Sequence, residues 1–225
     1  MESSAVEAPL IIDEMTAREL LSCAQRLQAI AQAGLTYSKS AYDTERYEEV
    51  RTLSARLLQG ITDEGFEKII RVFASETGYQ TPKVDVRVVI FRGVDEVLLV
   101  REKIDGDKWT LPGGWADIGY TPFEVARKEA LEESGLIVEP VRLLALWDKR
   151  EHSHPPQPWY VYKAFIQCEV VGGSLVQETS ETSGGSWFRK DALSGIELST
   201  DRVTESQLVK LFQFAEHPEL PTLCD

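Results

Sequence analysis

The sequence is poor in cysteine and has no long apolar run. Its 225 residues include three cysteines, Cys23, Cys168 and Cys224, which are far apart and form no C-x-x-C pair. This spacing argues against a zinc site and is typical of a protein in the reducing cytoplasm. No run of about 18 apolar residues is present, so we expect no membrane span. The first residues, MESSAVEAPLIIDEM, lack the basic region of a signal peptide.

Positive charge is also scarce. Lys and Arg total 24 against 37 Asp and Glu, which gives a net charge of −13. Such a chain lacks a large phosphate-neutralising surface, so the composition argues against nucleic acid as the partner. A small phosphorylated ligand remains compatible, because a bound metal ion supplies positive charge locally. The apolar content of 43% supports a real core, in one large domain or in one domain with an appendage.

The first part of the chain has the periodicity of helices. Apolar residues recur at helical spacing over residues 15–35 and 41–59, and the short turn TYSK between them predicts an antiparallel pair. A third helix is expected over residues 63–76. We therefore assign residues 1–80 to an all-helical N-terminal domain and residues 81–225 to a second domain. The apolar positions of the first two helices are Leu20, Leu21, Ala24, Leu27, Ile30, Ala31, Tyr42, Tyr47, Val50, Leu53, Leu57 and Leu58.

Beyond Pro82 the period changes to that of β-strands. A turn near Gly93 separates the first two strands, and the sequence WTLPGG predicts another. A short helix over residues 204–215 closes the chain. The expected strands lie within residues 84–93, 95–102, 109–114, 136–150, 159–173 and 183–195.

The stretch LPGGWADIGYTPFEVARKEALEESGL, residues 111–136, is the most informative part of the chain. Thr121 and Glu124 form a capping box, Pro122 suits the first helical position, and Gly135 is a natural stop. These signals predict a helix over residues 122–134. Its expected buried stripe is Phe123, Ala126 and Ala130.

This helix carries three acids, Glu129, Glu132 and Glu133. At about 100° per residue, Glu133 lies roughly 40° from Glu129 and Glu132 roughly 60° to the other side, so we expect the three carboxylates to converge on one edge. Like charges in this arrangement repel, and a bound cation would remove the repulsion. A solvated acidic face is the alternative interpretation.

The stretch resembles the signature of the Nudix hydrolases, G-x5-E-x7-R-E-U-x-E-E-x-G-U, where U is a bulky apolar residue. Gly114 opens the pattern, and Glu129, Glu132, Glu133, Gly135 and Leu136 fall in place. The resemblance implies an α/β fold, specifically an α/β/α sandwich, and a Mg²⁺ or Mn²⁺ site. It implies that Glu129 and Glu133 are metal ligands, with Glu132 a ligand or water-bridged, and that these acids with Lys128 form the catalytic group.

Three positions depart from the pattern. Tyr120 replaces the loop glutamate, Lys128 replaces the arginine, and Ala130 replaces the bulky apolar residue. A tyrosine hydroxyl with a pKa near 10 cannot serve as an anionic ligand at neutral pH, so we expect fewer or more weakly held cations. Asp117 lies nearby and is a candidate for compensation. Lys128 keeps the positive charge but loses the planar fork of arginine.

The N-terminal part resembles the helical extension of a bacterial Nudix subgroup. The segment AQRLQAIAQAGLTYSKSAYDTERYEEVR and the segments TPKVDVR, LPGGWAD and HSHPPQPWYVYK carry this resemblance. The subgroup acts on nucleoside diphosphates linked to another moiety, such as ADP-ribose, CDP-choline or nucleotide sugars. The resemblance also implies a homodimer. A helical pair packed on its own sandwich is the alternative.

Further residues are candidates for binding the substrate. Arg87 and Arg101 precede the box and could clamp phosphate oxygens, although an exposed strand arginine is commoner. Gly113 and Gly114 would allow close approach of metal and phosphate. Trp147 could stack on a base, although core packing is the default.

A late loop supplies two candidates for a catalytic base. Some Nudix enzymes draw such a base from outside the box, and Glu178 and Glu181 in ETSET qualify on that ground. A solvated acidic loop is the alternative.

The leading hypothesis is a metal-dependent pyrophosphohydrolase that cleaves a small nucleotide substrate to two phosphate monoesters. Two other functions stay open. Tyr120 and Lys128 are compatible with a nucleotide-binding sensor that hydrolyses poorly. Action on RNA ends is a third hypothesis, which the net charge of −13 weakens.

Overall fold

The protein is described here by a computed structural model, which covers residues 16–62 and 64–225. The chain divides into two units. One runs to Gln80 and includes Pro156–Pro158, and the other comprises Thr81–Pro155 and Trp159–Asp225. None of the helices within the described ranges combines the length and apolar character that a membrane crossing requires.

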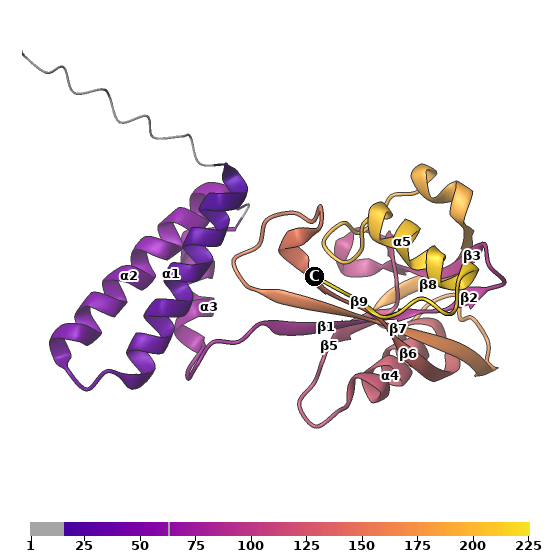
Figure 1. Ribbon diagram of the computed structural model, residues 1–225, viewed down its shortest axis with the longest axis horizontal. Helices are drawn as coiled ribbons and strands as arrows, with labels where there is room; N and C mark the ends of the chain where they lie inside the picture. Colours follow the sequence, from indigo (N-terminus) through magenta and orange to yellow (C-terminus); the bar gives the residue numbers. More distant parts are fainter. Residues whose placement is uncertain (1–15, 63) are drawn as a thin grey trace, which may run out of the picture. The chain divides into compact units, whose positions relative to one another are not determined.

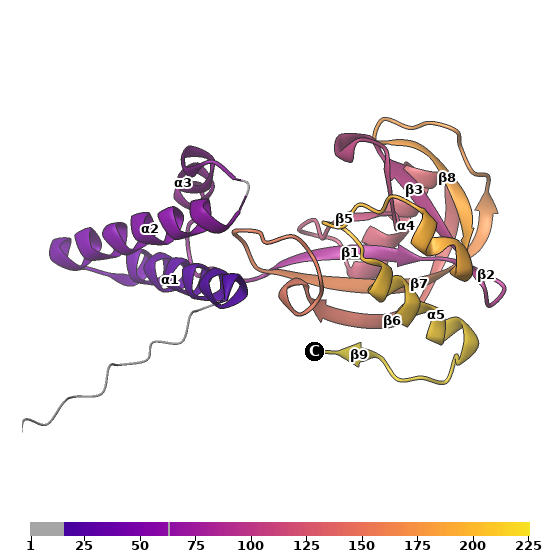
Figure 2. The ribbon, with the colours of Figure 1, turned by 90° about the horizontal axis from the view of Figure 1, so that it is seen from above.

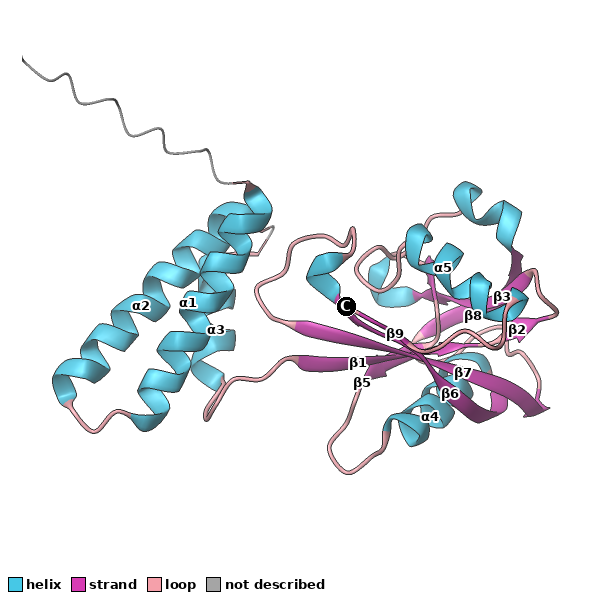
Figure 3. Cartoon of the chain, viewed as in Figure 1, coloured by secondary structure: helices cyan, strands magenta, loops and turns pink. Residues whose placement is uncertain are grey.

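Over residues 16–62 and 64–80, the first unit contains three helices (Figure 3). Thr16 and Glu19 form a capping box at the start of α1, and the Ser40 side chain caps α2. The expected start of the third helix at residue 63 lies outside the described residues, and the helix ends at Ser75. The helices are α1 (Ala17–Tyr37), α2 (Ala41–Ile61) and α3 (Phe66–Ser75), around a core of Leu21, Ala24, Ala55, Leu58, Ile69 and Phe73.

Part of the predicted helix stripes is exposed. Ile30, Tyr42, Leu53 and Leu57 are 46%, 76%, 49% and 41% exposed, so the helical spacing of these residues does not bury them within this chain. Small residues of α1 and α2 are fully buried, among them Ala24, Ser54 and Ala55, and the Ser54 hydroxyl donates to the Ala24 carbonyl oxygen. That contact covers one narrow stripe of each helix and leaves the wider apolar pattern uncovered.

The second unit contains two sheets (Figures 1 and 2). The five-stranded sheet has the order β5, β1, β7, β6, β9, in which β1 and β7 are parallel. In the four-stranded sheet, β3 pairs with β2, β4 and β8. The strands are β1 (Lys83–Val89), β2 (Phe91–Arg92), β3 (Glu96–Glu102), β4 (Lys108–Thr110), β5 (Gly113–Trp115), β6 (Leu136–Asp148), β7 (Val161–Gly173), β8 (Thr182–Arg189) and β9 (Leu223–Cys224).

Two helices cover opposite faces of the sheets, α4 (Pro122–Ser134) and α5 (Glu205–Glu216) (Figure 1). Strand β1 alternates between these faces, as a pleated strand must. Val86 and Val88 belong to the cluster with α4, whereas Val89 belongs to the cluster with α5. The predicted α/β/α sandwich with N-terminal helices is confirmed.

Two predicted strands are wrong because each is split between the sheets. Residues 84–93 form β1 and β2, and between them the Ile90 carbonyl oxygen accepts from Leu98 N. Residues 109–114 fall into β4 and β5. Pro112 lacks an N–H and interrupts that strand, while its carbonyl oxygen accepts from Val88 N at 2.8 Å.

The box helix α4 has the predicted bounds. Its capping box joins Thr121 and Glu124, and Gly135 takes a left-handed φ of 75° at the stop. The predicted burial of Phe123 is wrong, because it is 36% exposed and Val125 is buried in its place. The buried face therefore lies further toward the side of the helix that carries the acids.

Candidate active site

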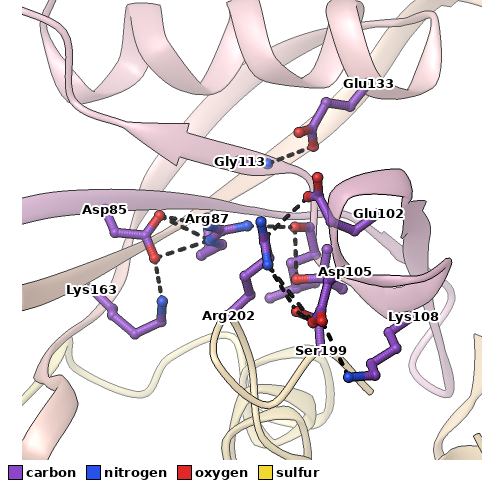
Figure 4. Close-up of polar contacts among 12 residues, drawn as sticks. Asp85, Arg87, Glu102, Asp105, Lys108, Gly113, Glu133, Lys163, Ser199 and Arg202 are labelled. Atoms are coloured by element: carbon purple, nitrogen blue, oxygen red, sulfur yellow. Dashed lines mark hydrogen bonds and ion pairs between the residues drawn. The ribbon is translucent and has the colours of Figure 1, made fainter. Parts of the chain in front are cut away.

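The glycine turn before α4 approaches strand β1 closely. Gly113 has a φ of 147°, and a Cβ there would clash with the Val86 carbonyl oxygen and lie 2.9 Å from Arg87 Cα. Only glycine fits this conformation and distance. The Gly113 N–H donates to Glu133 Oε2 at 2.9 Å (Figure 4). The turn therefore orients one carboxylate of the box helix.

Two of the three acids of α4 are buried against this turn. Glu129 is 7% exposed and Glu133 is 3% exposed. Burial raises the pKa of Glu133 to about 8, although Arg87 and the Gly113 amide oppose the shift. Burial also raises the pKa of Glu129, against the opposing charge of Lys128. A Cβ at Gly114 would lie 3.0 Å from Glu129 Oε1, so both carboxylates border the Gly-Gly turn.

The third acid, Glu132, is exposed, unlike Glu129 and Glu133. Its side chain is 50% exposed, and its Oε2 lies 3.7 Å from Lys128 Nζ. Lys128 also lies 3.7 Å from Glu129 Oε1 and 3.2 Å from Asp117 Oδ2. Within residues 16–62 and 64–225, no three His, Cys, Asp or Glu side chains form a group that could hold one ion. Glu129 and Glu132 lie on either side of the Lys128 amine, so the convergence of all three carboxylates on one metal site stays a prediction.

The buried pair nevertheless fits a hard divalent cation. Carboxylate oxygens are the ligands that Mg²⁺ and Mn²⁺ prefer, and Mg²⁺ is commonly held by one or two carboxylates plus water and substrate phosphates. Glu129 and Glu133 have raised pKa values because burial is only partly offset by nearby cations. A divalent ion would supply the missing positive charge. The donor set therefore suits the metal that the sequence pattern implies.

Arg87 belongs to a buried ion-pair group on the sheet. Its Nη2 donates to Asp85 Oδ1 at 2.8 Å, and Lys163 Nζ binds Asp85 Oδ2 (Figure 4). Burial would raise the pKa of Asp85, but Arg87 and Lys163 lower it, so Asp85 is ionised. Arg87 Nη1 donates to the Leu111 carbonyl oxygen at 3.2 Å. Because Arg87 is 5% exposed and bonded in this way, it supports the turn; the prediction of a free phosphate clamp is wrong.

A second polar group lies on the other side of Arg87. Glu102 is 7% exposed, and its Oε2 lies 3.1 Å from Arg202 Nε. Arg202 Nη1 also donates to Ser199 Oγ, which itself donates to Asp105 Oδ2 (Figure 4). Glu102 and Glu133 are close enough for the charge of Glu102 to raise the pKa of Glu133.

Sequence reasoning did not identify these partners. Asp85 and Arg87 alternate with valines, so both lie on one face of β1, which is a signal that was present. Lys163 interrupts an apolar run, a weaker signal. Nothing in the sequence around Arg202 indicates that its loop returns to Glu102.

Two other predicted binding residues lie elsewhere. Trp147 is 2% exposed, with its ring 4.9 Å from Phe165 and 4.8 Å from His152. It belongs to the core, so its predicted stacking on a base is wrong. Arg101 is exposed, lies over the Trp109 ring and donates from Nε to the Asp107 carbonyl oxygen at 3.2 Å.

The two late-loop acids differ from each other. The side chain of Glu178 is 73% exposed and pairs with Lys103 Nζ at 2.7 Å. Glu181 is exposed as well, but its charge raises the pKa of Glu129. Of the two, Glu181 is therefore the one that lies near the buried carboxylates.

Comparison with known proteins agrees with this geometry. The NUDIX domain model matches residues 81–212, and the model of the UDP-X-like N-terminal oligomerisation domain matches residues 18–73. The chain belongs to the Nudix family and is a Nudix hydrolase, an enzyme that acts on phosphorus-containing anhydrides.

Its relatives narrow the class. The chain is 48% identical over 206 residues to Bacillus subtilis (strain 168) YjhB, whose name provisionally makes it an ADP-ribose pyrophosphatase. That match covers 91% of this chain and 96% of YjhB. A crystal structure of a UDP-X diphosphatase is 32% identical, with a TM-score of 0.58 over 94% of this chain and 100% of that one. An ADP-ribose pyrophosphatase from Streptococcus suis 89-1591 is 36% identical, with a TM-score of 0.55, over 64% of this chain and all of that chain.

Proposed function

We propose that this enzyme is a metal-dependent pyrophosphohydrolase for a nucleoside 5′-diphosphate joined to a second moiety, of the ADP-ribose, CDP-choline or nucleotide-sugar type. The reaction adds water across the P–O–P bond and releases a nucleoside monophosphate and a second phosphate monoester. The relatives named for ADP-ribose and for UDP-X support this substrate class.

The observation that carries the proposal is the buried carboxylate pair at the glycine turn. Glu129 and Glu133 would hold Mg²⁺ or Mn²⁺, with exposed Glu132 reaching it through water. When bound, the metal neutralises charge on the diphosphate and lowers the pKa of a coordinated water. The Gly113 N–H holds Glu133 at 2.9 Å, so that carboxylate is oriented before the substrate arrives. This orientation limits the reorganisation that catalysis requires.

The remaining residues have supporting roles. Lys128 lies within 3.7 Å of both Glu129 and Glu132 and would limit repulsion among the acids. Glu132 and Glu181 are the candidates for the base that takes the proton of the attacking water. Arg101, which is exposed, remains a candidate for a phosphate contact.

The helical unit, which we assign to residues 1–80, would join two copies of the chain, and residues 81–225 would form the hydrolase domain. The exposed apolar residues Ile30, Tyr42, Leu53 and Leu57 support a homodimer, since a second copy could cover them. Light scattering should give twice the 25.3 kDa mass of the chain, and a monomer at micromolar concentration would contradict this assignment.

Product detection by chromatography tests the activity. The protein is incubated with ADP-ribose, CDP-choline, several nucleotide sugars and dinucleoside polyphosphates, with Mg²⁺ and separately with Mn²⁺. Metal-dependent release of a nucleoside monophosphate from one of the linked diphosphates is expected. Hydrolysis of none of them by the folded protein would overturn the proposal.

A second candidate function is a nucleotide-binding sensor with little hydrolysis. Tyr120 and Lys128 favour it, because the first cannot act as the anionic loop ligand and the second lacks the bidentate fork. Binding of a nucleotide without product release, under generous Mg²⁺ or Mn²⁺, would identify this function.

A further inference from the structure

A row of side chains crosses the five-stranded sheet beside the glycine turn. Trp115 on β5 is paired with Asp85 on β1, Asp85 with Lys163 on β7, and Lys163 with Trp147 on β6. Residues paired across strands present their side chains on the same face. Trp115 therefore stands on the face that carries Asp85 and, two residues along, Arg87.

The two ends of this row differ in exposure. Trp147 is 2% exposed, whereas Trp115, on the edge strand, is 50% exposed. Two further tryptophans contact neighbouring side chains, because Trp109 and Phe188 pack in a T-shaped pair and Arg92 lies over the Trp187 ring. All five tryptophans of the chain are described, and Trp115 alone among them is exposed.

The exposed indole belongs to the strand that begins at the glycine turn. Trp115 is two residues from Gly113, whose N–H binds Glu133. Two residues of strand span roughly 6.5 Å. Gly114 lies between them, and Glu129 borders it from the α4 face, so the indole stands on the opposite face of the same short strand.

We propose that Trp115 is the stacking platform for the nucleobase of the substrate. This inference rests on the proposed function, which places the diphosphate at Glu129 and Glu133. A nucleoside attached to that diphosphate carries its base one ribose away from the phosphates, and an exposed indole at the edge of the turn presents a flat face at that range. Stacking on an aromatic ring suits every base, because each base has a π face.

Binding of nucleoside monophosphates tests the platform without turnover. Calorimetric titration in Mg²⁺ would use AMP, CMP and UMP on the native full chain and on Trp115→Ala, Trp115→Leu and Trp115→Phe. We expect Trp115→Ala and Trp115→Leu to bind all three about 5- to 150-fold more weakly. Trp115→Phe should restore most of the affinity, because phenylalanine keeps a π face and leucine keeps only apolar volume.

Two controls separate stacking from other causes. Ribose 5-phosphate, which has no base, should bind all four proteins equally. Ile118→Ala, which removes another exposed apolar side chain of the same segment, should leave nucleotide binding unchanged. Unchanged nucleotide affinity in Trp115→Ala, full affinity in Trp115→Leu, equal loss of ribose 5-phosphate, or no nucleotide binding by the native protein would each overturn the inference.

The outcome is independent of the hydrolysis assay. If the native protein hydrolyses no linked diphosphate but binds nucleotides through Trp115, the proposed activity fails and the platform stands. If it hydrolyses one of them while Trp115→Ala keeps the native affinity for the released monophosphate, the activity stands and the platform fails. Loss of the dimer in Trp115→Ala, with nucleotide affinity intact, would make Trp115 an interface residue and also overturn the inference.

Discussion

The acids of α4 and the acids of the loop before β8 have the same chemistry in opposite environments. Glu133 is 3% exposed and holds a single backbone amide, and burial raises its pKa to about 8. The side chain of Glu178 is 73% exposed and paired with Lys103, which lowers the pKa of Glu178. The difference teaches that the number of acids in a segment does not identify a metal site. Carboxylates that are buried without enough neighbouring positive charge do identify one, because a bound cation would supply that charge.

Asp85 tests the cost of burial most strongly, since it is an acid whose burial is already compensated. Asp85→Asn would leave Arg87 and Lys163 buried without their anion. We expect the free energy of unfolding to fall by about 3–5 kcal/mol. Urea unfolding followed by tryptophan fluorescence measures it. Asp191→Asn, at an exposed pair with Arg189, is the matched control and should not change the midpoint measurably.

Substitution of Glu133 tests whether the buried acid of α4 is needed for activity. Glu133→Gln should lower kcat at least about 10²- to 10³-fold, the range lost when a group that stabilises transition-state charge is removed. The fold should persist, because glutamine can still accept from the Gly113 N–H. Product release and circular dichroism measure the two quantities. Retention of most of the activity would show that the buried carboxylate is not essential.

Metal-free stability should depend on pH through the same residue. The pKa of Glu133 is raised from 4.5 to about 8 in the folded protein, so the folded state binds its proton more tightly than the unfolded state does. The contribution of Glu133 to the free energy of unfolding is therefore fully present below about pH 4.5. It falls by on the order of 3 kcal/mol as the pH rises to about 8. Glu133→Gln should lack this component, and Mg²⁺ should restore stability to the native protein at pH 8. Thermal unfolding between pH 5 and 8 in EDTA would show an equal slope for both proteins if the assignment were wrong.

Glu132 should give a smaller effect. Its carboxylate is half exposed and pairs with Lys128 at 3.7 Å, so we expect Glu132→Gln to lower kcat by less than about tenfold. The kcat of this variant, set beside that of Glu133→Gln, measures how far the two acids differ. Equal losses in the two variants would mean that Glu132 turns inward when metal binds.

The late loop should give the smallest effect and separates its own two acids. Glu178→Gln removes an exposed surface pair and should change kcat by less than about twofold. Glu181→Gln should have the larger effect, because the charge of Glu181 reaches Glu129. Measurement of kcat for both variants shows which of the two acids contributes more to catalysis. A large loss for Glu178→Gln alone would reverse the placement of these acids.

What could be predicted from the sequence is what is decided locally. The bounds of α4 followed from Thr121, Glu124 and Gly135, which act within one turn of the helix ends. The α/β/α sandwich was predicted from the resemblance of residues 111–136 to the Nudix signature, because that signature belongs to one fold.

The rest depended on contacts between distant segments. Asp85 meets Lys163 only because β1 and β7 pair in one register, and sequence spacing carries no information on that register. The burial of Trp147 depends in the same way on the neighbours of β6. Helical geometry placed Glu129 beside Glu133, but it could not say that these two are buried against the turn while Glu132 stays exposed.

The close approach of Gly113 to β1 limits which positions can be varied in a mutagenesis library of this protein. Only glycine is expected to be tolerated at position 113, since a side chain there would both clash with Val86 and displace the amide that holds Glu133. Gly106 also has a positive φ, of 65°, but nothing lies within 4 Å of its missing Cβ, so asparagine should be tolerated there. A library should therefore leave position 113 fixed and sample position 106 only with asparagine and aspartate, which tolerate a positive φ.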